Sequence, residues 1–192
     1  SEALLKALHI LTRDGQLNQD SRRKLKQVLH LVQFLSPKLS DVKTVVDFGA
    51  GKSYLGFLLY DLVLKNLSDC ELYAVEERSE LIKKCKEIAS QSRFDRIHFI
   101  ESKIEESASN LPSSVDAVVA LHACDTATDD ALAIGLAKKA KLITVVPCCQ
   151  AEVARSLESL PHSDIDALWD QGIHRREFGS HLTNVIRCLV LE

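Results

Sequence analysis

Residues 45–55 read VVDFGAGKSYL, and this stretch decides the fold. An apolar run carries the acid Asp47 near its end, crosses Gly49 and Gly51, and then enters a sequence typical of a helix. Glycine at these two positions permits backbone angles that a Cβ would forbid, and it lets peptide groups approach a ligand closely. The stretch therefore predicts a strand, a tight turn and a helix that together bind a nucleoside-containing ligand.

Two phosphate-binding motifs share part of this pattern. A P-loop needs a glycine five residues before Gly51, but that position is Val46, inside the predicted strand. The dinucleotide fingerprint needs a third glycine where Tyr54 stands. What remains is an acid-x-Gly-x-Gly turn, and a P-loop NTPase is kept only as a third hypothesis.

A second acid supports the nucleoside interpretation. Residues 72–77 read LYAVEE, an apolar strand that ends in Glu76. Nucleoside-binding folds of this type place a carboxylate at the end of the second strand, where it accepts hydrogen bonds from ribose hydroxyls. We predict this role for Glu76 and expect Glu77 to be solvated.

The composition is that of an ordinary globular enzyme. The chain has 192 residues, of which 46% are hydrophobic and 27% charged, so it can bury one substantial core. The net charge of −3 gives no global attraction to nucleic acid, although RRKLK at 22–26 forms a local basic run. Six cysteines without disulfide-framework spacing indicate reduced thiols. With no apolar run long enough for a membrane span and no signal-like segment, we predict a cytoplasmic protein.

Apolar periodicity predicts alternating strands and helices. Strands are expected at 44–48, 71–75, 96–101, 116–121 and 142–146, and helices at 55–64, 80–89, 104–108, 129–140 and 181–191. This order predicts an α/β fold, a Rossmann-like doubly wound sheet that is mostly parallel. Residues 1–40 carry helical patterns only, so we expect them to form an N-terminal helical cap on a ligand-binding domain at 41–192.

Three motifs in this order carry a family resemblance. They are DFGAGK at 47–52, LHACD at 121–125 and PCCQ at 147–150, with a weaker match in RREFG at 175–179. Roughly from position 20 to 192, the chain resembles class I S-adenosylmethionine (SAM) methyltransferases. The resemblance is to the methyltransferase-like 25 group and to the methyltransferase domain of the glutathione S-transferase C-terminal domain-containing protein. It departs from the commonest pattern at Ser53, where a third glycine often occurs.

The resemblance implies a Rossmann-like methyltransferase with SAM as cofactor. We predict the cofactor-binding set Asp47, Gly49, Gly51, Glu76, Ser102, Lys103, Ile104 and Leu121. Ser102, Lys103 and Ile104 are placed at the adenine, and an ordinary turn into an amphipathic helix stays open as the alternative. A complete class I sheet has two strands after the fifth, so we expect strands 6 and 7 to be absent and the fifth strand to be an open edge.

Three residues at the ends of the fourth and fifth strands are catalytic candidates. His122 is expected to orient a substrate or act as a base, or to be satisfied by a backbone carbonyl. Asp125 is either a proton acceptor or the N-cap of the helix from Ala127. Cys148 is either a nucleophile toward a pyrimidine carbon or, like many buried cysteines, an apolar filler. A zinc site formed by His122, Cys124, Cys148 and Cys149 is the less favoured alternative, because adjacent cysteines rarely bind one metal, and we predict no metal.

Two functions from different classes follow. The first is a SAM-dependent methyltransferase acting on an acceptor such as ribosomal RNA, other RNA or a ribosomal protein, with no membrane partner. The second is a catalytically inactive SAM-fold module that serves as a scaffold for an RNA or protein. Aromatic residues make up only 5% of the chain, which argues against a surface that stacks unpaired bases.

Overall fold

The computed structural model describes residues 1–17, 19–147, 150–160 and 164–192. The strands are β1 (Thr44–Phe48), β2 (Glu71–Glu76), β3 (Ile97–Glu101), β4 (Ala117–Ala120) and β5 (Leu142–Val145). The helices are α1 (Glu2–Ala7), α2 (Gln19–Leu35), α3 (Tyr54–Leu62), α4 (Ser79–Ser92), α5 (Thr126–Ala137), α6 (Glu152–Glu158) and α7 (Gly172–Leu191). Single 3₁₀ turns lie at η1 (Ser36–Lys38), η2 (Leu64–Asn66), η3 (Ser107–Asn110) and η4 (Asp166–Leu168).

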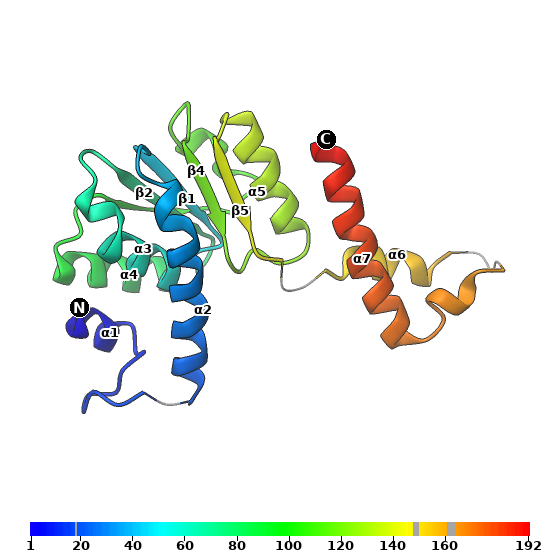
Figure 1. Cartoon of the computed structure of the whole chain (residues 1–192), viewed down its shortest axis with the longest axis horizontal. Helices are drawn as coiled ribbons and strands as arrows, with labels where there is room; N and C mark the ends of the chain where they lie inside the picture. The colour runs from blue at the N-terminus through cyan, green and yellow to red at the C-terminus, as the bar shows by residue number, and fades with distance from the viewer. Residues whose placement is uncertain (18, 148–149, 161–163) are drawn as a thin grey trace.

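The described strands form one parallel sheet in the order β3-β2-β1-β4-β5 (Figure 1). At the centre, Val46 pairs with Tyr73 of β2 and with Val118 of β4. Both faces of β1 are buried, which explains why its sequence is a continuous apolar run rather than an alternating one. The predicted α/β doubly wound fold is confirmed, and the strand ends differ from the predicted ones by at most one residue.

Helices cover both faces of the sheet. Alternate β1 residues enter two different cores, because successive side chains of a strand point to opposite faces. Val45 lies in the core formed with α1, α2, α3 and α4, whereas Val46 and Phe48 lie in the core formed with α5 and the β3–β4 connection. The sheet is thus covered on both sides, and its strand ends are left open for a site.

The first forty residues share the core of the sheet. Leu4 and Leu8 of the α1 region and Val32 and Leu35 of α2 are buried in the same cluster as Val45. The helical character of this segment agrees with the prediction. The boundary drawn at residue 40 stays a prediction, and the shared core ties the cap closely to the sheet.

One predicted helix is wrong, and another was predicted too short. The expected helix at 104–108 is wrong, and a 3₁₀ turn at Ser107–Asn110 follows β3 instead. The Ser107 hydroxyl and amide both donate to the Ile104 carbonyl, at 2.7 and 3.0 Å, so the chain closes a three-residue turn there. The predicted helix at 181–191 is the second half of α7, which already begins at Gly172.

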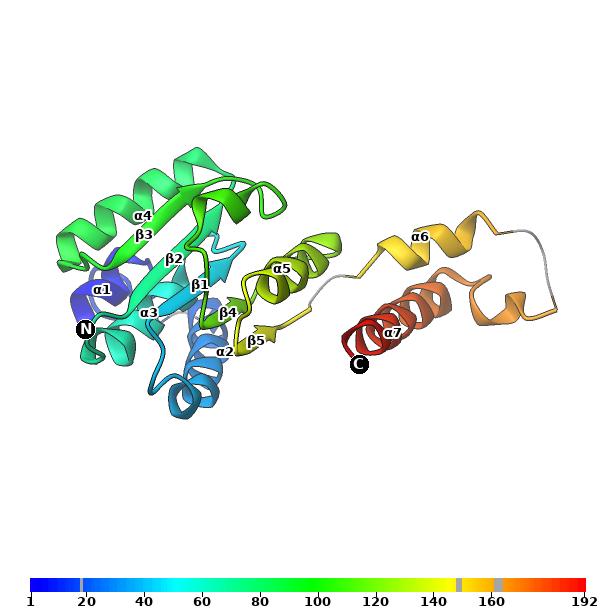
Figure 2. The ribbon, with the colours of Figure 1, turned by 90° about the horizontal axis from the view of Figure 1, so that it is seen from above.

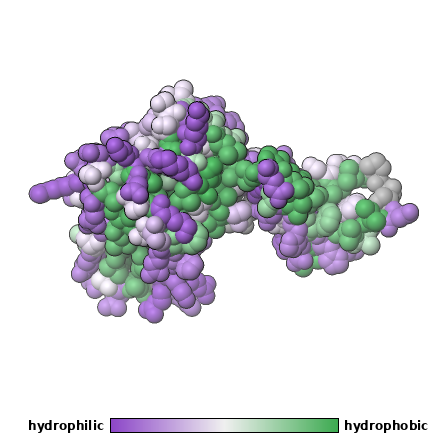
Figure 3. Space-filling view, turned by 45° about the horizontal axis from the view of Figure 1, so that its top comes forward, coloured by the Kyte–Doolittle hydropathy of each residue, from purple (hydrophilic) through white to green (hydrophobic). Residues whose placement is uncertain are grey.

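Helices α6 and α7 form a hairpin that stands away from the sheet (Figures 1 and 2). A Cβ on Gly179 would lie 2.8 Å from the Ala154 backbone, so the two helices touch closely. Arg187 reaches back to α5, with Nε 2.6 Å from Asp129 Oδ1 and Nη2 2.9 Å from Asp129 Oδ2. Figure 3 shows apolar surface on this hairpin, where Leu189 and Val190 are exposed.

The described part of the chain after β5 holds helices and no further strand. In the order of the sheet, β5 has β4 as its neighbour and lies at the edge, as predicted for a sheet without strands 6 and 7. Among the described residues, no helix is both long enough and apolar enough to span a membrane.

Candidate functional site

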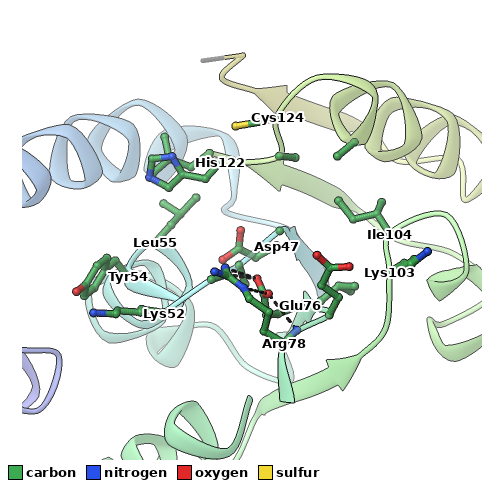
Figure 4. Close-up of a pocket in the computed structure, with 18 of the residues that line it drawn as sticks. Asp47, Lys52, Tyr54, Leu55, Glu76, Arg78, Lys103, Ile104, His122 and Cys124 are labelled. Carbon is green, nitrogen blue, oxygen red and sulfur yellow. Dashed lines mark hydrogen bonds and ion pairs between the residues drawn. The ribbon is translucent and has the colours of Figure 1, made fainter. Parts of the chain in front are cut away.

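A cavity of about 680 Å³ opens at the carboxyl ends of β1, β2 and β4 (Figure 4). Cavities of roughly 300 to 1,000 Å³ are typical of sites for small molecules and cofactors. All eight residues of the predicted cofactor-binding set line it: Asp47, Gly49, Gly51, Glu76, Ser102, Lys103, Ile104 and Leu121. His122 and Cys124 also line it. The topology brings these residues together because the carboxyl ends of parallel strands meet at one edge of the sheet.

The glycine turn between β1 and α3 forms the floor of the cavity. Gly49 and Gly51 have φ of +64° and +59°, in the left-handed region that favours glycine. A Cβ on Gly49 would lie 3.4 Å from the Ala123 backbone, so the turn packs directly against the turn after β4. Glycine is therefore favoured at position 49 by its backbone conformation, and a Cβ there would be in van der Waals contact with Ala123.

Three amides of this turn are bonded within the protein. Ala50 N–H donates to Val75 O at 3.0 Å, Gly51 N–H to Glu76 Oε2 at 2.8 Å, and Ser53 N–H to Ala50 O at 2.7 Å. A phosphate-binding loop instead points free amides at its anion. These three amides are thus not free to bind a phosphate as the amides of a P-loop are, which counts against the NTPase hypothesis.

Ser53 stands where the resemblance expects a third glycine. Its φ is +52°, so it adopts a glycine-like conformation in spite of its side chain. The hydroxyl is buried, and among the described residues it has no hydrogen-bond partner. Serine at this position therefore adopts a conformation that favours glycine, at the cost of backbone strain and a buried hydroxyl without a partner in the described chain.

Asp47 presents a buried carboxylate to the cavity. The residue is 2% exposed, and its Oδ2 has no hydrogen-bond partner within the described chain. Burial raises the pKa of Asp47 to about 7, a hydrogen bond from the Gly56 backbone opposes the rise, and the charge of Glu76 adds to it. A buried carboxylate beside a cavity suits a ligand with an N–H donor, above all a cationic one.

Glu76 is held in place by four donated hydrogen bonds. Besides the Gly51 amide, it accepts from Arg78 N at 3.1 Å, Arg78 Nε at 2.6 Å and Arg78 Nη2 at 3.3 Å (Figure 4). Burial acts to raise the pKa of Glu76, but the hydrogen bonds from Arg78 and Gly51 and the charge of Arg78 outweigh it and leave the pKa below its ordinary value. Glu76 is thus ionised at neutral pH and faces the cavity with its acceptor sites occupied.

The segment after β3 forms another wall. Ser102 N–H donates to the Glu76 carbonyl at 3.2 Å, which continues the ladder between β2 and β3. Ile104 packs against the core under α5, and Lys103 lies near Glu105 with 3.7 Å between Nζ and Oε1. Figure 4 shows Ile104 and Lys103 along the same side of the cavity. This wall combines an apolar side chain with backbone groups, as a planar base requires.

The mouth of the cavity lies between the turn after β4 and α2. His122 is exposed there, and Lys24 and Gln27 of α2 line the same cavity. Partial burial and then the charge of Lys24 lower the pKa of His122, so its imidazole is neutral at physiological pH. A neutral imidazole at the mouth can accept a proton from a bound group.

Asp125 is placed outside the cavity. Its Oδ1 accepts from Ala151 N and Glu152 N, both at 3.0 Å, and its Oδ2 pairs with Arg155 Nη2 at 2.7 Å. Burial opposes these contacts, but the hydrogen bonds and the charge of Arg155 hold the pKa of Asp125 below its ordinary range. The carboxylate therefore caps α6 rather than the helix from Ala127, because the donors of α6 reach it from 26 residues away in sequence.

The cysteine hypotheses fall largely outside the described residues. Cys148 and Cys149 lie in a part of the chain that the structure does not describe, so the nucleophile and zinc hypotheses have no geometry. Elsewhere in the described ranges, no three potential metal ligands come together.

Sequence reasoning missed several residues that line the cavity. Arg78, Asp130, Gln27 and Lys24 were not assigned to it. Arg78 lies two positions after the strand-end acid, a spacing at which a side chain can fold back on that acid. The α2 residues carried no such signal, because only the packing of α2 on the sheet brings them to the cavity.

Comparison with known proteins adds the family. The profile of the family described as "Methyltransferase domain" matches residues 23–156. This span includes the glycine turn, Glu76, the segment after β3 and the turn after β4.

Curated relatives match most of the chain. The glutathione S-transferase C-terminal domain-containing protein of Xenopus laevis is 27% identical over 152 residues, which is 78% of this chain and 23% of the relative. The protein of the same name from Bos taurus is 24% identical over 155 residues, or 80% of this chain and 23% of the relative. The chain thus spans less than a quarter of the length of these relatives.

Solved structures share the architecture. An rRNA methylase from Streptococcus thermophilus superposes with a TM-score of 0.51 at 18% identity, covering 69% of this chain and 78% of that chain. At this identity the likeness concerns the fold alone.

Proposed function

Because this chain belongs to the methyltransferase-domain family, we propose that it is a SAM-dependent methyltransferase with its cofactor in the cavity at the carboxyl ends of the strands. The single observation that carries the proposal is the Asp47 carboxylate, which is 2% exposed and lines the cavity with Oδ2 unpartnered. A buried unpaired acceptor is costly unless a ligand satisfies it. The ammonium group of the methionine moiety of SAM is a suitable donor.

The remaining cavity walls fit the other parts of SAM. Glu76 lies where the ribose hydroxyls would be received, at the end of β2 beside the glycine turn. Gly51 leaves space over the turn, and Ile104 with Leu121 offers apolar contact. Because the turn amides are bonded internally, the fit favours a cofactor without phosphate groups.

SAM supplies a methyl group that its sulfonium already activates, so the protein's task is alignment. The glycine turn and the buried carboxylates would fix the cofactor within the cavity. His122, neutral and exposed at the mouth, would accept a proton where the acceptor group must lose one. Asp125 would contribute only by stabilising the structure, because its carboxylate caps α6.

The acceptor that we propose is RNA. Arg22, Arg23, Lys24 and Lys26 are exposed on α2, and Lys24 also lines the cavity, so positive charge lies beside the mouth. Phosphate groups of a nucleic acid would be attracted to this strip and would bring a nucleotide toward His122. Positive charge next to a methyl-transfer pocket favours a polyanionic acceptor over an uncharged one.

The first test is isothermal titration with S-adenosylhomocysteine, the demethylated product of SAM. We expect binding by the native chain and a loss of at least about tenfold in Asp47→Ala and Glu76→Ala, because each removes a charge-assisted hydrogen bond. The matched control is Glu71→Ala, at the opposite end of β2, where Glu71 contacts Tyr73 and His98 outside the cavity. A folded native chain that binds neither SAM nor its product would contradict the proposal.

The acceptor is tested by transfer of labelled methyl groups from SAM to total RNA and, separately, to ribosomal proteins. Label in RNA that falls when Arg22, Arg23 and Lys26 are changed to Glu together would support an RNA acceptor. Label in protein alone would overturn the RNA assignment and leave the methyltransferase assignment in place.

One observation favours a second candidate, a SAM-fold module without catalysis. Arg78 occupies the acceptor sites of Glu76 that a ribose would use. If that contact were permanent, the nucleoside would lose its strongest polar anchor. A chain that binds RNA or protein but not S-adenosylhomocysteine would match this second function.

A further inference from the structure

Arg78 binds the same carboxylate oxygens of Glu76 that the ribose hydroxyls of a nucleoside would need. Arg78 donates three hydrogen bonds to Glu76, and the Gly51 amide donates a fourth. A carboxylate has about four acceptor positions in total. No acceptor position of Glu76 is therefore left for a pair of ribose hydroxyls while Arg78 stays where it is.

The position of the guanidinium strengthens this view. A Cβ built on Gly51 would lie 3.8 Å from Arg78 Nη2, so the guanidinium lies against the glycine turn, beside the space that the missing side chain leaves for a ligand. Figure 4 shows the Arg78 side chain extending over Glu76 within the cavity. The arginine thus occupies both the acceptor and part of the space above the turn.

The two partners differ in how easily they can move. The side chain of Glu76 is 5% exposed and is fixed by the Gly51 amide, whereas the side chain of Arg78 is 56% exposed. Arg78 can swing into solvent with little loss of packing, because long cationic side chains keep their charged ends hydrated. The acid is fixed, and the competitor is mobile.

We propose that Arg78 is a built-in competitor of the ribose diol, which leaves Glu76 when a nucleoside cofactor binds. Binding then exchanges a guanidinium for two hydroxyls at one buried carboxylate. The arginine keeps Glu76 ionised and paired in the empty protein, and it lowers the affinity for any nucleoside by the strength of the displaced contact. This inference rests on the proposed function, since it concerns the same cavity.

The experiment compares nucleoside affinity in the native chain and in Arg78→Ala by isothermal titration. Arg78 is more than half exposed, and solvent screening weakens its contact with Glu76, so we expect Arg78→Ala to bind S-adenosylhomocysteine about two- to fivefold more tightly. Arg78→Lys should fall between the two, because an ammonium cannot make the same forked contact. Lys83→Ala is the matched control, since it removes an exposed positive charge from α4, the helix that follows Arg78, and lies outside the cavity.

A pair of probes separates competition from a structural effect. Adenosine carries the two hydroxyls and 2′,3′-dideoxyadenosine does not, so Arg78→Ala should tighten binding of adenosine alone. Adding Glu76→Gln to Arg78→Ala should remove the gain. Equal affinities in the native chain and Arg78→Ala, or a gain shared by both probes or by Lys83→Ala, would overturn the inference. Loss of S-adenosylhomocysteine binding in every folded variant would instead count against the proposed function.

Discussion

Two acids near the carboxyl ends of neighbouring strands have opposite surroundings in this protein. Asp47 of β1 is buried beside a cavity with Oδ2 unpartnered, and burial raises its pKa to about 7. Asp125, after β4, accepts from two amides and a guanidinium, and its pKa is lowered. Position at the end of a strand does not by itself make an acid a ligand-binding group. What decides is whether the rest of the chain supplies its donors.

The largest predicted effect on stability comes from filling the space beside Asp47, which would disturb the surroundings that distinguish it from Asp125. A Cβ on Gly56 would lie 2.5 Å from Ser53 Oγ and 3.2 Å from Asp47 Oδ2. Gly56→Ala should lower the free energy of unfolding by about 2 kcal/mol through overpacking, in spite of the better helix propensity of alanine. Chemical denaturation measures it, and Gly172→Ala, with open space around the added Cβ, should be close to neutral.

The second test removes Asp125, the acid whose oxygens already accept hydrogen bonds from α6. Asp125→Ala leaves the first amides of α6 without their cap, and we expect a loss of about 1 to 2 kcal/mol in the free energy of unfolding. The affinity for S-adenosylhomocysteine should stay within about twofold of the native value, because Asp125 does not line the cavity. Denaturation and titration on the same sample give both numbers. A large loss of affinity without a loss of stability would return Asp125 to the active site.

The third test uses pH. The folded protein keeps a proton on Asp47 that the unfolded chain releases above about pH 3.8, so the contribution of Asp47 to stability falls as the pH rises from there to about 7. Cofactor binding has the opposite trend, since the ionised carboxylate binds an ammonium group far more strongly than the protonated carboxyl does. Affinity for S-adenosylhomocysteine should be about tenfold lower at pH 6 than at pH 8. In Asp47→Asn this dependence should flatten, and a native profile that is equally flat would rule out the raised pKa.

The smallest expected effect concerns Ser53. Ser53→Gly relieves a left-handed φ of +52° and removes a buried hydroxyl that has no partner in the described chain. We expect a gain of about 1 kcal/mol in the free energy of unfolding. Thermal melting detects it as a small upward shift. A loss of stability would show that the hydroxyl makes a favourable contact.

Much of the fold could be predicted from the sequence, because the strands are continuous apolar runs and the glycine turn has a specific spacing. The eight residues of the cofactor-binding set could be predicted to lie together as well. They lie at or just after the carboxyl ends of parallel strands, and these ends meet at one edge of the sheet. Their role in binding stays a prediction. The hydrogen bonds of Glu76 could not be predicted from the sequence. The pattern shows where the carboxylate lies along the strand, but it does not show that Arg78 donates to its oxygens.

Other misses have a common physical cause. One expectation for Asp125 was that it caps the helix that follows it in sequence. The amides that its carboxylate accepts from belong instead to α6, far along the chain. The helix expected at 104–108 depended on periodicity, and the hydroxyl of Ser107 closed a shorter turn. Both outcomes depend on hydrogen bonds that apolar patterns do not encode.

The central place of β1 has a consequence for hydrogen exchange. Its amides and carbonyls lie in ladders with strands on both sides, and Val45, Val46 and Phe48 are fully buried. Such amides exchange with solvent only when much of the sheet opens, whereas those of the edge strands β3 and β5 exchange through local fraying. Deuterium should therefore enter β1 last. The carboxylate of Asp47 would then be carried by the segment that opens most rarely, so the floor of the cavity keeps its shape while the edge strands exchange many times.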